Sequence, residues 1–191
     1  KDLKENSTGN LFIVFLDSTH SEYSSPDKFE KPFMPAATSL DYLGITRSAK
    51  ELELVKNRYR NSVFWVDHLM GSFFNSLKEK GLYDDAVIVI TGDHGEEFLE
   101  EGSLFHGTHL NDWQTKVPLF YKFPDCEDHK IGSLSTHLDI FPSLLHYLTD
   151  CSDYTSLFDG KSIFAADRWD FAFTMQHNGV DTPYEFRLFN G

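Results

Sequence analysis

Three almost wholly apolar runs along the chain predict the strands of a buried sheet. They are Leu11–Leu16, Ala86–Ile90 and Val117–Tyr121. A strand that is covered on both faces is a continuous apolar run, because neither face meets water. Helical or long connections separate the three runs, so we expect them to be neighbours in a mostly parallel sheet.

Between the first two runs, a period of three to four residues predicts a helix over residues 49–80. A capping box, Ser48-Ala49-Lys50-Glu51, opens this helix, and Gly81 follows it as a typical stop signal. At 1.5 Å per residue the helix would be about 45 Å long and would lie along the sheet. His68 is interpreted as a solvated helix residue and not as a ligand. The apolar stripe consists of Leu52, Val55, Tyr59, Val63, Val66, Met70, Phe73 and Leu77.

The second half of the chain contains a further predicted helix and a hairpin. Asp139 is placed as the N-cap of a helix that continues to Leu148, and this role is favoured over a ligand role. Asp170–Gln176 and Tyr184–Phe189 alternate like half-buried strands on either side of a turn. The acidic stretch Glu96–Leu104 is interpreted as a short helix. The predicted fold is α/β, a three-layer sandwich with a mostly parallel sheet and a C-terminal β-hairpin, forming one domain with its core over 1–160 and an extension over 161–191.

Potential ligands follow two of the predicted strands at the points where these strands end. Asp93 and His94 come just after Ala86–Ile90, and His20 comes shortly after Leu11–Leu16. In open α/β sheets the ligand crevice lies beyond the carboxyl ends of the strands, so we expect His20, Asp93, His94 and the nearby His106 to converge at one edge of the sheet. A carboxylate beside an imidazole can give a divalent ion one oxygen and one nitrogen ligand. The alternative is an Asp that caps the next turn beside an incidental His, and for an isolated Asp-His-Gly this alternative would be favoured.

Charge and composition narrow the classes of partner. A net charge of −13 over 191 residues argues against nucleic acid and against an anionic bilayer as partners. No apolar run approaches the roughly 20 residues of a membrane helix. The chain begins with Lys1, so we expect a piece of a longer protein, in which a membrane anchor could lie upstream. Cys126 and Cys151 could form a disulfide in an oxidising compartment or remain ordinary thiols, and their spacing does not decide between the two.

The order of these motifs resembles the sulfatase branch of the alkaline phosphatase superfamily. The resemblance is to membrane-anchored sulfatase-like proteins and phosphoethanolamine transferases of the Gram-negative envelope, and it runs from about Leu11 to Phe158. It implies an alkaline-phosphatase-like fold, of which residues 1–191 would be the carboxy-terminal portion. The matching segments are LFIVFLDSTHSEYSSP before the long helix and, after it, ITGDHGEEF, FHGTH, VPLFYKFP and THLDIFPSLLHYL.

The resemblance also implies roles for four residues. Asp93 and His94 would bind the principal catalytic metal, which is zinc, manganese, magnesium or calcium according to subfamily. In the phosphoethanolamine transferases a His twelve positions beyond the Asp-His pair lies at the substrate or at a second metal, and His106 is twelve beyond His94. Another His follows the earlier strand in these proteins, and His20 matches it. His20 and His106 are therefore the predicted catalytic residues, whereas His109 has no firm counterpart.

Two parts of the family's site have no match in the sequence. Family members need an amino-terminal strand with further acidic ligands, and a Cys (as formylglycine), Ser or Thr nucleophile at the start of a helix. Ser24-Ser25-Pro26-Asp27-Lys28 echoes the Cys-x-Pro-x-Arg signature of sulfatases, but it lies in the wrong block and has Lys for Arg. We interpret it as a coincidence, so the nucleophile is not expected in this chain.

The resulting prediction is part of a metal-dependent hydrolase or transferase that acts on phosphate or sulfate esters, a lipid headgroup among them. The full-length protein would be anchored in the inner membrane with this domain at its periplasmic face, and the isolated chain would be inactive. One rival is a sulfatase-like fold that has lost turnover and serves as a lipid-binding or regulatory module. A weaker rival is a self-contained metal-binding domain, which would need more ligands than the two placed here.

Overall fold

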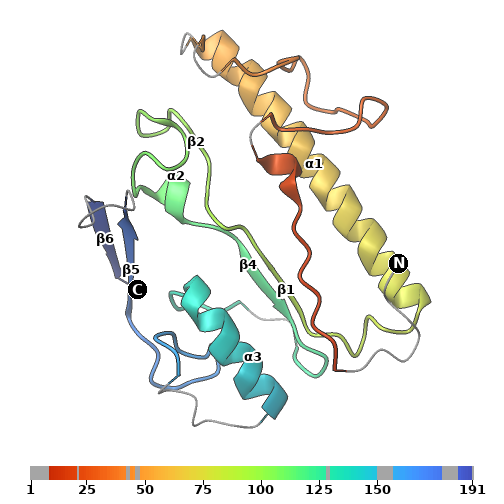
Figure 1. The fold of residues 1–191 in the computed structure, drawn as a ribbon, viewed down its shortest axis with the longest axis vertical. Helices are drawn as coiled ribbons and strands as arrows, with labels where there is room; N and C mark the ends of the chain where they lie inside the picture. The colour runs from red at the N-terminus through yellow and green to blue at the C-terminus, as the bar shows by residue number, and fades with distance from the viewer. Residues whose placement is uncertain are drawn as a thin grey trace. The chain divides into compact units, whose positions relative to one another are not determined.

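The computed structural model describes residues 9–20, 22–41, 44–45, 48–127, 130–149, 157–177 and 185–190 (Figure 1). The chain divides into two compact units. The first unit comprises Lys1–Ile90 and Leu119–Asp125, and the second comprises Thr91–Pro118 and Cys126–Gly191. Among the helices that the structure describes, none combines the length and hydrophobicity needed to cross a bilayer.

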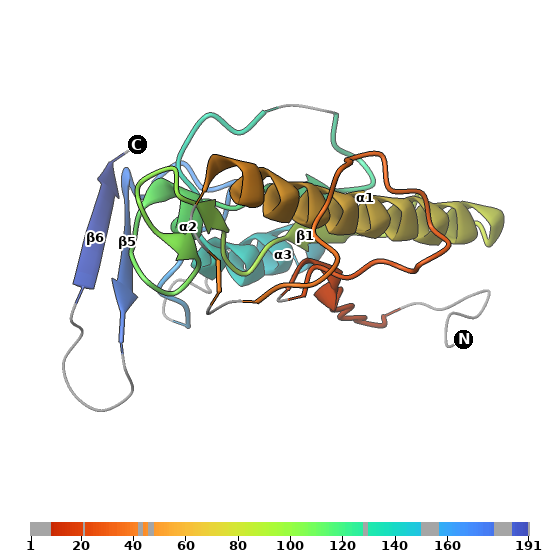
Figure 2. The same cartoon turned by 90° about the horizontal axis from the view of Figure 1, so that it is seen from above.

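The long helix α1, Ala49–Glu79, is the largest element of the first unit and confirms the predicted helix. Ser48 caps its start, because the Ser48 hydroxyl accepts a hydrogen bond from the Glu51 amide at 3.3 Å. Gly81 follows its end with a φ of +65°, a conformation that glycine adopts without steric penalty. Figure 2 shows α1 as one continuous helix with the 22–41 loop running along it.

Polar side chains of α1 fasten this loop to the helix. Asn61, which is 3% exposed, donates to the Phe33 carbonyl at 2.9 Å and accepts from the Phe33 amide at 3.1 Å. The Arg58 guanidinium donates to the carbonyl oxygens of Glu22, Ala37 and Thr38. These side-chain bonds take the place of the strand or helix hydrogen bonds that the loop backbone lacks. A loop without regular structure is thereby held against α1.

Two of the predicted strands pair with each other. β1, Ile88–Thr91, and β4, Leu119–Lys122, form a two-stranded sheet. The Lys122 ammonium, at the end of β4, donates to the Tyr83 and Ala86 carbonyl oxygens at 2.5 and 3.0 Å, just before β1 begins. The two strands therefore run in opposite directions. Sheets of the predicted class commonly carry such an antiparallel strand beside parallel ones.

The prediction of a third buried strand at Leu11–Leu16 is wrong. This segment has no strand structure, and the residues from Leu11 to Phe15 are between 48 and 86% exposed. A strand exists only where a neighbour accepts and donates its backbone hydrogen bonds, and among the described residues β1 and β4 pair with each other alone. An apolar run predicts a buried strand only where neighbouring strands supply these hydrogen bonds and cover the side chains.

The second unit begins with a small hairpin where a helix was expected. β2, Glu97–Phe98, pairs antiparallel with β3, Leu104–Phe105, so the interpretation of Glu96–Leu104 as a helix is wrong. The turn between the strands contains Leu99 and Gly102 at positive φ, which breaks any helical path. The one-turn helix α2, Asp112–Thr115, follows.

The predicted helix after Thr136 is present but begins earlier than expected. A 3₁₀ turn, η2, covers His137–Asp139 and continues into α3, Ile140–Thr149. Thr136 is the N-cap, and Asp139 closes a capping box from the third position, where its carboxylate accepts the Thr136 amide at 2.9 Å. The prediction of Asp139 as the N-cap is therefore wrong, since Thr136 holds that place, but Asp139 does cap the helix start through its side chain.

The C-terminal hairpin is confirmed. β5, Phe171–Gln176, pairs antiparallel with β6, Glu185–Asn190, in a register that opposes Phe171 to Asn190. The predicted turn over 178–183 lies outside the described residues. Cys126 is exposed, and its candidate disulfide partner Cys151 also lies outside the described residues.

Candidate functional site

The loop after β1 brings a carboxylate and an imidazole to the same side of the chain. Asp93 Oδ1 accepts the His94 backbone N–H at 3.0 Å, and Asp93 Oδ2 lies 3.7 Å from His94 Nε2. Both side chains reach solvent, with 73% of Asp93 and 37% of His94 exposed. The predicted ligand pair is therefore accessible to an ion or a substrate.

The tautomer of His94 suits a metal ligand. Its Nδ1 lies 2.8 Å from the Gly95 carbonyl oxygen, which can only accept, so Nδ1 carries a proton and, in the neutral ring, the lone pair is on Nε2. Metal-binding histidines usually donate their other N–H to a carbonyl or carboxylate in this way. Adjacent ligands around a tetrahedral ion with bonds of about 2.0–2.1 Å lie about 3.3 Å apart, close to the Oδ2–Nε2 separation found here.

Two donors do not complete a site. Across the described ranges, the structure assembles no group of three His, Cys, Asp or Glu side chains able to hold a metal ion. A closed structural zinc site has four ligands, and a catalytic site has three from the protein. The Asp93–His94 pair therefore fits part of a divalent-ion site, whose remaining ligands would come from elsewhere.

His106 joins this pair from the neighbouring hairpin. Its ring centroid lies 3.9 Å from that of His94, with 32° between the planes. Its Nδ1 lies 3.0 Å from Glu96 Oε1, and the Glu96 side chain is 7% exposed. The carboxylate accepts from Nδ1 and so orients the ring, with Nε2 on its other side. The structure thus brings Asp93, His94 and His106 together, while the roles assigned to them remain predictions.

His20 belongs to the first unit, whereas the other three residues belong to the second. It follows a 3₁₀ turn, η1, over Asp17–Thr19, and its Nδ1 lies 3.9 Å from the Asp17 carboxylate. The side chain is 52% exposed. Its predicted convergence with the cluster formed by Asp93, His94 and His106 stays a prediction.

Sequence reasoning gave no role to Glu97, which is the most deeply buried charged residue of the hairpin. Glu97 is 0% exposed, and its carboxylate accepts four hydrogen bonds: Oε1 from the Glu101 and Ser103 amides, and Oε2 from Asn111 Nδ2 and Gln114 Nε2. Burial raises the pKa of Glu97, but the four donors together outweigh it and hold the pKa below its usual value. The second glutamate of the Asp-His-Gly-Glu-Glu motif was the available signal.

His137 was also missed as a residue of this region. Its Nε2 lies 2.8 Å from the Gly92 carbonyl oxygen and 3.3 Å from the Thr91 hydroxyl. A donor to the Gly92 carbonyl restrains the backbone just before Asp93. The signal was the His between Thr136 and Leu138, in the segment whose pattern predicts only a helix start.

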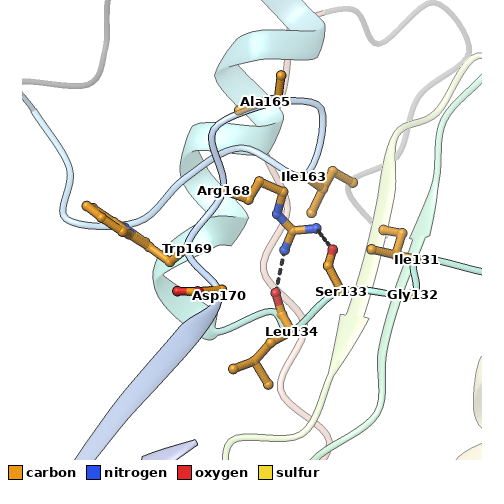
Figure 3. A pocket seen from close by; sticks show the side chains of 10 residues that line it. Ile131, Gly132, Ser133, Leu134, Ile163, Ala165, Arg168, Trp169 and Asp170 are labelled. Carbon is orange, nitrogen blue, oxygen red and sulfur yellow. Dashed lines mark hydrogen bonds between the residues drawn. The ribbon is translucent and has the colours of Figure 1, made fainter. Parts of the chain in front are cut away.

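A cavity of about 650 Å³ lies in the second unit, lined by residues of 131–134 and 163–170 (Figure 3). Figure 3 shows the Arg168 guanidinium donating to the Ser133 hydroxyl and the Leu134 carbonyl, at 2.6 and 2.7 Å. Arg168 Nη2 also donates to the Ser135 hydroxyl at 2.7 Å and lies 3.8 Å from Asp139 Oδ2. The Arg168 guanidinium is thus hydrogen-bonded to the protein itself. It links the residues just before β5 to those just before η2.

Comparison with known proteins agrees with the resemblance described above. The chain is 30% identical over 122 residues to lipoteichoic acid synthase 2 of Bacillus subtilis (strain 168), covering 59% of this chain and 18% of that protein. It is 29% identical over 118 residues to the inner membrane protein YejM of Salmonella typhimurium, covering 58% of this chain and 19% of that protein. The chain thus spans about a fifth of the length of these relatives.

A solved structure shares the fold. The phosphonate monoester hydrolase SpPMH from Silicibacter pomeroyi superposes with a TM-score of 0.61 at 22% identity, over 76% of this chain and 30% of that chain. This likeness confirms the predicted α/β, alkaline-phosphatase-like fold class with its C-terminal hairpin. The sequence model of the Sulfatase family matches residues 2–150, so the chain belongs to the Sulfatase family.

Proposed function

We propose that this chain is part of a metal-dependent hydrolase or transferase that acts on phosphate or sulfate esters. The observation that carries the proposal is the cluster of Asp93, His94 and His106, in which a carboxylate and two imidazoles meet at the end of β1. Membership of the Sulfatase family supports it. A rigid scaffold that presents such groups on loops is the usual arrangement of a catalytic site.

Asp93 Oδ2 and His94 Nε2 are the atoms that would hold a zinc, manganese, magnesium or calcium ion. Such an ion, when bound, supplies the positive charge that polarises a phosphoryl or sulfuryl oxygen. His106, held at Nδ1 by Glu96, presents Nε2 to the reacting groups. With Nε2 also protonated, the imidazolium would bind an oxygen of the transferring group or pass the Nε2 proton to the leaving oxygen. His20 is assigned the matching role of a second substrate-facing imidazole.

The nucleophile and the remaining acidic ligands are assigned to other parts of a longer protein. The chain covers 18 and 19% of two relatives, which leaves room for these groups. Because catalytic groups that act as a unit lose nearly all activity when one is missing, the isolated chain is expected to show negligible turnover. It is also expected to bind divalent metal weakly, with two protein ligands instead of three or four.

The names of two relatives support a substrate class and a location for the full-length protein. One is a lipoteichoic acid synthase and another an inner membrane protein. These names support a phosphate ester on a lipid headgroup as the substrate and an inner-membrane location, to which we add the periplasmic face as part of the proposal. The acidic chain itself would contribute no attraction to an anionic bilayer.

The test is turnover of an aryl phosphate and an aryl sulfate by the full-length protein, with each of the four metals. Asp93→Ala and His106→Ala should each abolish turnover. Asp85→Ala, which removes an exposed aspartate before β1, should leave it unchanged. Full activity of Asp93→Ala would overturn the proposal, and so would a wild-type protein that turns over neither ester with any of the metals.

A further inference from the structure

We propose that Glu97 is a positioning residue for His106 and acts through Gln114, without itself touching the imidazole cluster. The proposal rests on the proposed function only in the assumption that His106 acts at the reacting centre. It goes beyond it by assigning the placement of that imidazole to a buried carboxylate and a buried amide.

The backbone provides the first connection between Glu97 and His106. Glu97 opposes Phe105 in the β2–β3 pair, so the residues just outside this pair, Glu96 and His106, lie side by side. Their side chains form the 3.0 Å contact between Glu96 Oε1 and His106 Nδ1. The position of the Glu97 backbone therefore determines how closely the Glu96 carboxylate approaches the His106 ring.

Gln114 provides the second connection. Its Nε2 donates to Glu97 Oε2 at 2.7 Å and to the Thr108 hydroxyl at 2.8 Å. Its Oε1 accepts the backbone amides of Thr108 and His109, both at 3.1 Å. Thr108 and His109 lie two and three residues beyond His106, so Gln114 fixes the far end of the loop that carries the imidazole.

The carboxylate determines which way the Gln114 amide faces. An ionised carboxylate only accepts, so the NH₂ end of Gln114 must turn toward Glu97 and the carbonyl end toward the loop amides. All four partners of Glu97 are neutral donors. Replacing Glu97 by Gln would set an amide NH₂ against Asn111 Nδ2 and Gln114 Nε2, which leaves buried donors without acceptors.

A purely structural role explains this arrangement less well. Burying an ionised carboxylate without a cation is costly, and a hairpin is stabilised at least as well by apolar packing. A fully satisfied polar network instead selects one geometry among several of similar energy. The single geometry selected here is that of the 106–109 loop.

The test uses nitrogen-15 NMR of the full-length protein labelled at histidine. At a pH where the ring is neutral, His106 of the wild type should show one tautomer, with the proton on Nδ1. Glu97→Gln and Gln114→Ala should each convert this signal to a mixture of tautomers, because the ring is no longer held against Glu96. Glu101→Gln changes an exposed glutamate of the same turn and should have no effect, and the His68 signal on α1 should stay constant in every variant.

Two further measurements separate the possible failures. If Glu97→Gln does not fold, the folded Gln114→Ala decides, since it leaves Glu97 with its other three donors. The exchange Glu97→Gln with Gln114→Glu restores the donor and acceptor pairing between the two positions, with only Asn111 Nδ2 left facing an NH₂ group, and should shift the His106 signal back toward the single tautomer. Where the full-length protein turns over an ester, the single variants should lose roughly 10- to 100-fold in kcat with little change in KM.

An unchanged His106 signal in a folded Gln114→Ala or Glu97→Gln protein would overturn the proposal. A changed signal, in a protein where His106→Ala retains full ester turnover, would support the positioning by Glu97 and overturn the proposed function instead.

Discussion

Gly95 lies where the loop after β1 passes closest to α2, and Gly95→Ala tests this contact. A Cβ built at Gly95 would lie 2.0 Å from the Trp113 carbonyl oxygen and 2.9 Å from its carbon. Both atoms are backbone, so no side chain can rotate away. An ordinary contact needs about 3.4 Å, and the backbones must therefore separate by about 1.4 Å.

This separation has two consequences for the free energy of unfolding. Overpacking costs about 1–3 kcal/mol. The hydrogen bond from the Gly95 amide to the Gln114 carbonyl, now 2.9 Å long, would be stretched or lost, which costs about 0.5–1.5 kcal/mol. We expect Gly95→Ala to lose about 1.5–4.5 kcal/mol in total. Because His94 donates to the Gly95 carbonyl, the same shift would move the predicted ligand.

Equilibrium unfolding in urea measures the change in the full-length protein. The matched control is Gly71→Ala in α1, where nothing lies within 4 Å of the added Cβ. There the substitution should stabilise by about 0.5–1 kcal/mol, because alanine has the higher helix propensity. Gly95→Ala as stable as the wild type would refute the close approach of the loop to α2.

Two smaller perturbations test other contacts of the second unit. Ser143→Ala should lower the free energy of unfolding by about 1–3 kcal/mol, measured by thermal unfolding. The fully buried Ser143 hydroxyl accepts the Ile163 amide at 3.0 Å, and its removal leaves that amide unpaired. A neutral result would show that this hydroxyl is dispensable. The hydrogen bond from Lys116 lowers the pKa of Asp112 below its usual value, and Arg187 adds to the shift. The stabilisation from Asp112 is therefore complete above the unfolded-state pKa and is lost as the pH falls through the lower folded-state pKa, so Asp112→Asn should flatten the acid side of a stability–pH curve.

Local patterns predicted those elements that depend on local forces. The 3.6-residue period and the Ser48 cap predicted α1, since helix hydrogen bonds join residues four apart. The alternation of Asp170–Gln176 and Tyr184–Phe189 predicted the C-terminal hairpin, because the partner of each strand is the next strand along the chain. The failure at Leu11–Leu16 has a different cause, because a strand depends on neighbours that no pattern within the segment describes.

The residues of the candidate site also fall into those that local sequence identifies and those that depend on distant partners. The Asp-His-Gly motif after a strand pointed to Asp93 and His94, the family resemblance added His106, and the structure brings these three together. Glu97 could not be identified, because its role depends on Asn111 and Gln114, which are 14 and 17 residues away. Its four donors converge only once the hairpin and α2 have folded.

Divalent-metal affinity of the full-length protein tests the central claim most directly. Removal of one protein ligand should weaken binding by at least about 100-fold, since even the loss of an outer hydrogen-bond partner of a ligand costs 10- to 100-fold. We therefore predict that isothermal titration with zinc or manganese shows this loss for Asp93→Ala and wild-type affinity for Asp85→Ala. Wild-type affinity in Asp93→Ala would contradict the assignment of the cluster as a metal-dependent site.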